Sequence, residues 1–211
     1  MLSVTELSCV RGHRPLFAPA TFSLHPGQAL HVLGDNGVGK TSLLRIVCGL
    51  TPPHSGQVRW QGQSIRDDAA TFHRALFYLG HHLSLKEELT GIENLLADAA
   101  VAGHAITVAQ AKEALIHMGL KGREHLPLRV MSQGQKRRVA LARLRLTQAV
   151  LWVLDEPFVA LDARAVDHLR VLLGAHVAAG GMVLFTSHQP VMLSHNGQDE
   201  AVQTYRLELA A

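Results

Sequence analysis

Hydrophobic positions follow two different periods along the chain, and each period predicts an element. Short continuous apolar runs predict buried strands, whereas apolar residues three or four positions apart predict helices. Apolar runs and turn signals lead us to expect strands at residues 2–4, 6–7, 20–24, 29–33, 150–154 and 182–186, a hairpin at 58–63, and a loop at 11–19. Helical spacing predicts helices at 41–47, 139–146 and 166–177, with a short strand or hairpin at 196–211.

Residues 89–120 differ in character, because Ala, Leu and Glu dominate there and β-branched runs are sparse. This stretch predicts a helical subdomain at about residues 85–140, inserted between two strand-rich parts. A short strand, a Gly-rich turn and a helix in succession are the usual entry to a parallel α/β sheet. The pattern therefore predicts one α/β domain over residues 1–211 that carries a helical insertion.

Composition narrows the class of protein without deciding its chemistry. With 47% hydrophobic and 18% charged residues, the chain is expected to be globular, and its formal net charge of +3 does not indicate a nucleic-acid binder. Cys9 and Cys48 have no metal-site spacing, which favours a reducing compartment. The N-terminus lacks a secretory signal pattern, and no apolar run is long enough to cross a bilayer. We expect a cytosolic chain unless a partner holds it at a membrane.

The segment from Gly34 to Thr41 reads G-x(4)-G-K-T, the phosphate-binding loop pattern. Glycines let backbone N–H groups turn around an anion, and a helix starting near Gly39 adds its positive end. Lys40 is expected to reach the β and γ phosphates, and the Thr41 hydroxyl to ligate Mg²⁺. The expected nucleotide-binding positions here are Gly34, Asp35, Asn36, Gly37, Val38, Gly39, Lys40, Thr41 and Ser42.

A second chemical feature follows the apolar run 150–154, where Asp155 and Glu156 stand together. A buried parallel strand delivers such residues to the sheet edge at which ligands bind in open α/β folds. Asp155 is placed to hold Mg²⁺, and Glu156 to polarise the attacking water. Four apolar residues and two acids would alone be a weak signal, but the loop at Gly34 strengthens it.

Between these features lies Met-Ser-Gln-Gly-Gln at 131–135, followed by the basic helix that begins Lys-Arg-Arg. This segment resembles the LSGGQ signature of ABC ATPases, with Gln133 in place of the first glycine. Ser132, the Gly134 N–H and the helix N-terminus would form a second anion-binding surface, to which the resemblance adds Gln135. In the family this surface binds nucleotide held by another subunit. For Arg137 and Arg138 we expect a solvated helix face.

Further motifs follow in the order of that family. Ala-Leu-Asp at 160–162 resembles the D-loop and implies a nucleotide contact for Asp162, while Thr-Ser-His at 186–188 resembles the switch region, whose His188 contacts the γ-phosphate. Besides Gln133, two positions depart from the family pattern. Arg11 stands where an aromatic side chain stacks on adenine, and a guanidinium can also stack on a base. His82 replaces the Q-loop glutamine that couples hydrolysis to transport.

The resemblance implies an α/β P-loop NTPase fold with a RecA-like parallel core sheet, N-terminal antiparallel strands and an inserted ABC helical subdomain. It also implies an ATPase that uses ATP and Mg²⁺. Because each chain has one phosphate loop and one signature, the working unit would be a homodimer closing over two ATP molecules.

Several non-catalytic segments narrow the resemblance further: Trp-Gln-Gly-Gln at 60–63, Leu-Gly-His-His at 79–82, the run 151–158 and His-Gln-Pro at 188–190. Together with the absence of a regulatory segment after the switch region, they resemble the CcmA family, the ATP-binding subunits of the haem exporter in cytochrome c maturation. This implies membrane-spanning partners, CcmB and CcmC, no nucleic-acid partner, and a peripheral position at the cytoplasmic face of the bacterial inner membrane. ATP turnover would drive release of a haem-loaded chaperone.

Three alternatives remain at this point. Another ABC importer or exporter ATPase would differ only in its membrane partner. A soluble ABC protein of translation or DNA repair usually carries two cassettes or coiled-coil insertions, and neither is recognisable here. A regulatory nucleotide sensor is disfavoured by the presence of Lys40, Asp155, Glu156 and His188. The sequence does not identify the transported substrate.

Overall fold

The computed structural model describes residues 1–188, 190–195, 198–201 and 204–209. The chain divides into two compact units, each of which is described by itself. Unit 1 comprises Met1–Gly80, Ala149–Pro157 and Arg170–Ala211, and unit 2 comprises His81–Gln148 and Phe158–Leu169. Residues 85–140, for which a helical subdomain is expected, fall within unit 2.

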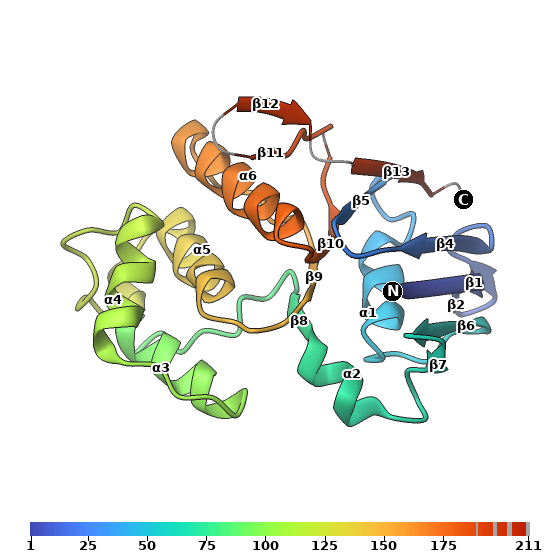
Figure 1. Ribbon diagram of the computed structural model, residues 1–211, viewed down its shortest axis with the longest axis horizontal. Coiled ribbons are helices and arrows are strands. Elements are labelled where there is room, and N and C mark those ends of the chain that lie inside the picture. Colours follow the sequence, from blue (N-terminus) through green and yellow to red (C-terminus); the bar gives the residue numbers. More distant parts are fainter. Residues whose placement is uncertain (189, 196–197, 202–203, 210–211) are drawn as a thin grey trace. The chain divides into compact units, whose positions relative to one another are not determined.

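A five-stranded parallel sheet forms the centre of unit 1, in the order β13-β5-β10-β9-β8 (Figure 1). Of its three interior strands, β9 and β10 are buried at every position and β5 at its four central positions, as expected of parallel strands covered on both faces. The strands expected at 29–33, 150–154 and 182–186 are confirmed to within a residue. The strands of this sheet are β5 (Gln28–Leu33), β8 (Leu76–Leu79), β9 (Leu151–Leu154), β10 (Met182–Thr186) and β13 (Thr204–Glu208).

The two edge strands of this sheet were not evident as such in the sequence. β8 is a four-residue apolar run, too short for patterning alone to distinguish a strand from a helix, and β13 alternates polar and apolar residues. Hydrogen bonds between main chains place both strands in the sheet, and the pattern of apolar residues does not report such pairing. The expected element 196–211 contains β12 (Gln198–Ala201), which pairs with β11 (Ser194–His195) just before it, and β13, which lies parallel to β5. Residues 196–197, 202–203 and 210–211 lie outside the described residues.

A second, antiparallel sheet of unit 1 has the order β4-β1-β6-β7. The two N-terminal strands expected at 2–4 and 6–7 are one strand, β1, with an irregularity where Glu6 adopts a φ of 48°. The hairpin around Gly62 is confirmed by the pairing of β6 with β7. The strands of this sheet are β1 (Leu2–Ser8), β4 (Ala20–Leu24), β6 (Ser55–Trp60) and β7 (Gln63–Ser64).

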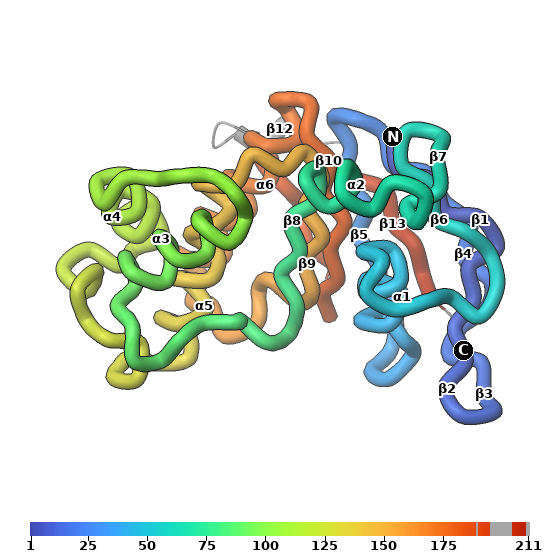
Figure 2. The backbone as a smooth tube through the Cα atoms, turned by 90° about the horizontal axis from the view of Figure 1, so that it is seen from below, coloured from blue at the N-terminus to red at the C-terminus, as the bar shows by residue number. Residues whose placement is uncertain are grey.

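The stretch 11–19, expected to be a loop, contains two short strands. β2 (Val10–Arg11) pairs antiparallel with β3 (Arg14–Pro15), with Gly12 at the turn in a left-handed conformation of φ 65°. Figure 2 shows this hairpin extending beyond the ends of β1 and β4. The expectation was wrong because a two-residue strand is too short to leave a hydrophobic period.

Helix α1 (Lys40–Val47) follows β5 directly and contributes to the core of unit 1. Its residues Leu43, Leu44 and Val47 are fully buried, in agreement with the apolar spacing of the expected helix. They form one hydrophobic cluster with side chains of both sheets, so the core fixes the strand that precedes the helix and the loop between them. The other helices with residues in unit 1 are α2 (Ala69–Ala75) and the second half of α6 (Ala163–Ala178).

Unit 2 is helical, and its helices begin at well-defined caps. Thr90, Thr107 and Ser132 each form a capping box, in which the hydroxyl and the side chain three residues later satisfy two backbone N–H groups. The helices pack pairwise on one another. The elements are α3 (Gly91–Val101), α4 (Val108–His117), the 3₁₀ turn η1 (Leu128–Val130), α5 (Gln133–Ala142) and the 3₁₀ turn η2 (Arg143–Arg145).

One expectation for α5 was wrong. The stretch 139–146, expected to continue the basic helix, is the second part of α5, which begins at Gln133, followed by the 3₁₀ turn η2. Arg137 is only 6% exposed, and Arg138 is half-buried with Nη1 donating to the Gly119 carbonyl over 3.4 Å. A solvated face was expected for both arginines, but α5 packs against α3 and α4 and therefore encloses Arg137.

Candidate functional site

The loop from Gly34 to Gly39 leaves the end of β5 and leads into α1. Gly34, Gly37 and Gly39 have φ angles of 144°, 83° and 105°, a region that side chains other than that of glycine rarely adopt. A Cβ at Gly39 would lie 2.8 Å from the Phe17 ring, so this position also has no room for one. Gly39 caps α1 without a side-chain hydrogen bond, which leaves N–H groups of the first turn available to an anion.

Lys40 is the first residue of α1, and its side chain is buried beneath this loop. Its Nζ donates hydrogen bonds to the carbonyl oxygens of Gly34 and Asp35, the latter over 3.0 Å. These contacts hold the ammonium group inside the curve of the loop. The lysine charge therefore lies where the backbone N–H groups of the loop and the helix end also collect positive potential.

Asp155 follows β9 and is 1% exposed. The Thr41 hydroxyl donates to its Oδ2 over 2.7 Å, and the Thr186 hydroxyl donates to its Oδ1 over 2.9 Å. Both carboxylate oxygens are thus held by hydroxyl groups that come from the ends of different elements. The sequence expectation placed Thr41 and Asp155 at one site, and the structure brings them into contact.

Glu156 stands next to this carboxylate in a left-handed conformation, with φ 51°. Its backbone N–H donates to Thr186 Oγ1 over 2.8 Å, so one hydroxyl orients both acidic residues. Nε2 of His188 lies 3.6 Å from Glu156 Oε1, and the His188 side chain is 52% exposed. A carboxylate and an imidazole therefore face each other at the carboxyl end of the parallel sheet.

The remaining expected residues of unit 1 lie along the loop or in the N-terminal hairpin. Asp35, Asn36 and Gly37 are exposed at the loop tip, whereas Val38 is buried. Ser42 is half-buried in the first turn of α1, and Arg11 is exposed on β2. Arg11 thus has the exposure that stacking on a base requires.

The other expected residues belong to unit 2. Ser132 caps α5, and its hydroxyl accepts from the Gln135 N–H while Gln135 Oε1 accepts from the Ser132 N–H. A Cβ on Gly134 would lie 2.7 Å from the Ala160 carbonyl oxygen, so the 131–135 segment contacts the 160–162 segment closely only because residue 134 is glycine. Asp162 accepts from the Ala165 N–H over 2.8 Å at the start of α6.

His82 is exposed, and its ring meets that of His81 edge-on, with centroids 5.8 Å apart. The backbone that follows His82 is held within unit 2 by Arg143, which donates to the carbonyls of Leu83 and Ser84 and pairs with Asp98 at 2.7 Å. The segment that carries His82 is therefore anchored just after it.

Sequence reasoning missed the role of Thr186 and of two residues behind the loop. Thr186 was noted only as part of a motif, although a hydroxyl at the last position of a buried strand was a usable signal. Phe17 and Leu16 line the space beneath Gly39, and no period or motif marks them. They contact the loop although they lie far from it in the sequence, and a local sequence pattern does not report such long-range contacts.

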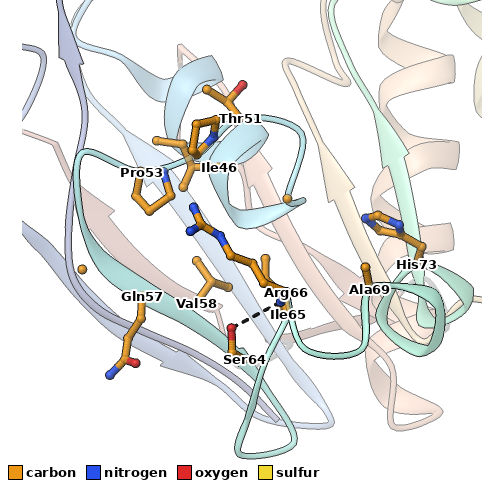
Figure 3. Close-up of a pocket in the computed structure, with 13 residues that line it drawn as sticks. Ile46, Thr51, Pro53, Gln57, Val58, Ser64, Ile65, Arg66, Ala69 and His73 are labelled. Atoms are coloured by element: carbon orange, nitrogen blue, oxygen red, sulfur yellow. Dashed lines mark hydrogen bonds between the residues drawn. The ribbon is translucent and has the colours of Figure 1, made fainter.

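Unit 1 also has a surface pocket of about 480 Å³ away from these residues (Figure 3). It lies between the end of α1, strand β6 and the start of α2, with Ile46 and Ile65 on its apolar side and Arg66 and His73 on its polar side. None of the residues expected to bind nucleotide lines it. The loop at Gly34 remains the candidate site because its backbone geometry and buried lysine fit an anion.

No helix within the described residues is both long and apolar enough to span a membrane.

Comparisons with known proteins agree with this geometry. Residues 17–159 match the ABC transporter family. The cytochrome c biogenesis ATP-binding export protein CcmA of Dechloromonas aromatica (strain RCB) is 51% identical over 191 residues, which are 90% of this chain and 94% of the relative.

Two solved structures share the fold. A putative ABC transporter ATP-binding protein from Pyrococcus furiosus superposes with a TM-score of 0.82 at 24% identity, covering 99% of this chain and 96% of the other. The ATP-binding cassette MJ0796, a dimer bound to ADP and phosphate, has a TM-score of 0.78 at 21% identity, covering 90% of this chain and 88% of the other. The chain belongs to the ABC transporter family and, within it, to the family of the cytochrome c biogenesis ATP-binding export proteins CcmA.

Proposed function

We propose that this chain is the ATP-hydrolysing subunit of an ABC export complex that acts in the biogenesis of c-type cytochromes. Family membership and the 51% identity to a cytochrome c biogenesis ATP-binding export protein support this role. The observation that carries the proposal is the pair of hydroxyl contacts on Asp155, from Thr41 and Thr186, beside a glycine loop that encloses Lys40.

The residues at the loop fit a magnesium ion bound together with nucleotide. Mg²⁺ takes oxygen ligands and usually uses only one or two protein side chains with phosphate oxygens and water. The Thr41 hydroxyl and the Asp155 carboxylate provide two such oxygens 2.7 Å apart. Bound Mg²⁺ would neutralise phosphate charge.

Nucleotide binding and activation of the attacking water are assigned to residues of the chain itself. Lys40 and the N–H groups of the loop bind the phosphates of ATP, and Arg11 packs on the base. Glu156 accepts a hydrogen bond from the attacking water and draws its proton away, and His188 holds the γ-phosphate side of the site. Because Thr186 contacts Asp155 and the Glu156 N–H, it sets the relative position of the metal ligand and the base.

The site is completed by a second copy of the chain. Unit 2 presents Ser132, Gly134 and Asp162, and these residues contact the nucleotide held by the partner copy. Gln135 contributes its amide from the same helix start. The dimeric state of the MJ0796 cassette, which shares this fold, supports a dimer of this kind. ATP binding closes the two copies, and hydrolysis lets them separate.

In this proposal, membrane-spanning subunits, which we expect to be CcmB and CcmC, receive this motion at the cytoplasmic face of the bacterial inner membrane. The segment from Leu79 to Leu89, including His82, forms the contact that transmits it. Turnover then drives release of the haem-loaded chaperone on the far side of the membrane.

A complementation experiment tests this function. The full chain, the Lys40→Ala variant and the Lys121→Ala control are expressed in a bacterium that lacks its own CcmA, and haem-stained c-type cytochromes are measured. We expect the wild-type chain and the Lys121 variant to restore cytochromes and to co-purify with membrane subunits from solubilised membranes. The Lys40 variant should co-purify without restoring cytochromes. Full restoration by Lys40→Ala, or wild-type co-purification with ribosomes or DNA instead, would contradict the proposal.

A further inference from the structure

His31 lies in the middle of β5 and is completely buried. Its Nε2 is 2.8 Å from Ser187 Oγ, the residue that follows β10. The imidazole stacks on Phe185, with ring centroids 4.4 Å apart and planes inclined by 13°. A polar side chain in a buried strand thus connects the strand that leads into the phosphate loop with the strand that leads to His188.

The environment keeps this imidazole neutral. Burial lowers the pKa of His31 to about 4, and the positive charge of Arg206 on the neighbouring strand β13 acts in the same direction. Within the described residues, Nδ1 has no hydrogen-bond partner. A buried N–H group without a hydrogen-bond partner costs more free energy than a buried nitrogen acceptor without one. Nδ1, which has no partner, is therefore assigned as the unprotonated nitrogen, and Nε2 carries the proton. His31 then donates to the Ser187 hydroxyl.

Of three successive residues of the chain, the first and the third contact the proposed catalytic group, and the one between them contacts His31. Thr186 holds Asp155 and the Glu156 N–H, Ser187 accepts from His31, and His188 lies 3.6 Å from Glu156. Fixing the middle residue restricts the backbone on both sides of it. The direction in which His188 leaves the strand therefore depends on the hydrogen bond between His31 and Ser187.

We propose that His31 is a positioning residue for ATP hydrolysis, because through Ser187 it sets the placement of His188 and Thr186 around Glu156. This inference rests on the proposed function of Glu156 and His188. An apolar side chain would fill this place in the strand without leaving a buried nitrogen unsatisfied. The polar contribution that distinguishes histidine here is its hydrogen bond to Ser187.

The test compares three variants of the full chain by steady-state ATPase kinetics. His31→Leu removes the donor, Ser187→Ala removes the acceptor, and His31→Gln keeps an N–H donor on a side chain of similar reach. We expect kcat to fall about fivefold in the first two, which corresponds to about 1 kcal/mol, while His31→Gln retains at least half of it. The KM for ATP should stay within about twofold of the wild-type value, because a lost positioning contact acts on the transition state.

The double variant His31→Leu with Ser187→Ala should lose no more than the stronger single variant, since both remove one interaction. Rates are expressed per folded molecule, with the folded fraction taken from urea unfolding. A kcat within twofold of wild type for His31→Leu and Ser187→Ala, or a loss confined to KM, would overturn the role of His31. Failure of the proposed function would give a different result: Glu156→Gln would then hydrolyse ATP as fast as the wild-type chain, or neither would hydrolyse it.

Discussion

The Thr41 hydroxyl donates a hydrogen bond to Oδ2 of Asp155 over 2.7 Å, although 114 positions separate the two residues in the chain. Thr41 is in the first turn of the helix after β5, and Asp155 follows β9. Strand β10 lies between these two strands, and its last residue, Thr186, holds the other oxygen of Asp155. The first turn of α1 and the last residue of β10 thus both hold the one carboxylate that follows β9.

Gly39→Ala is expected to weaken nucleotide binding by at least about tenfold. The new Cβ would meet the Phe17 ring at 2.8 Å while the backbone stays at a φ of 105°, so the loop must shift to accommodate it. The φ strain alone costs about 1 kcal/mol or more. Titration with a fluorescent ATP analogue measures the affinity, and urea unfolding measures the change in stability.

Gly122→Ala is the matched control for that variant. Gly122 has a φ of 80°, but its Cβ would meet nothing within 4 Å, and the residue is outside the expected site. Gly122→Ala should lose stability because of backbone strain, but it should bind nucleotide with the wild-type affinity. Equal affinities for Gly39→Ala and wild type would show that the loop tolerates the side chain and that its geometry is not required.

His82→Gln is expected to keep at least half of the ATPase rate. The His82 side chain is exposed and meets only the edge of the His81 ring, and glutamine is the residue that the family uses at this position. Phosphate release under saturating ATP measures the effect, with His117→Gln, at an exposed residue of α4, as the control. A loss of more than tenfold would give His82 a dedicated role in this chain.

The folded state is expected to lose stability as the pH falls from 7 to 5. His31 has a folded pKa of about 4, below its unfolded value near 6.5, so the unfolded chain binds the proton first. Stability from this residue is present above the unfolded pKa and is lost as the pH falls below it. The loss from His31 alone is about 2 kcal/mol between pH 7 and pH 5.

Urea unfolding at several pH values measures this dependence. His31→Gln should flatten the profile, although not completely, because burial also lowers the pKa of His176. Parallel profiles for wild type and His31→Gln would mean that His31 has the same pKa in the folded and unfolded chains, contrary to its burial.

Apolar patterning was sufficient to predict the strands and helices that have a clear period. The runs at 29–33, 150–154 and 182–186 are continuous because parallel strands are buried on both faces, and helix 41–47 buries Leu43 and Leu44 at helical spacing. The largely exposed strand β13 was not predicted to join the main sheet, since its place depends on pairing with β5. The hairpin of β2 and β3 is too short to show a period.

The residues of the site that belong to short sequence motifs could be predicted. The loop at 34–41 and the Asp155–Glu156 pair were evident because their chemistry needs glycine, lysine and carboxylates at fixed spacing. The contacts of Thr186 with Asp155 and of His31 with Ser187 depend on strand order and register. The burial of Arg137 was missed because a basic run carries no information about which face the neighbouring helices cover.

Glu156→Gln tests the central claim most directly, because it preserves the shape of the side chain and its backbone contact with Thr186 while removing the carboxylate. The full chain is assayed for phosphate release and, with ATP, for mass by light scattering, beside Glu88→Gln as an exposed control. We predict that turnover falls by at least about 100-fold, with an ATP-dependent dimer that persists, and that the control behaves as wild type. Hydrolysis by Glu156→Gln at a near wild-type rate would contradict the account.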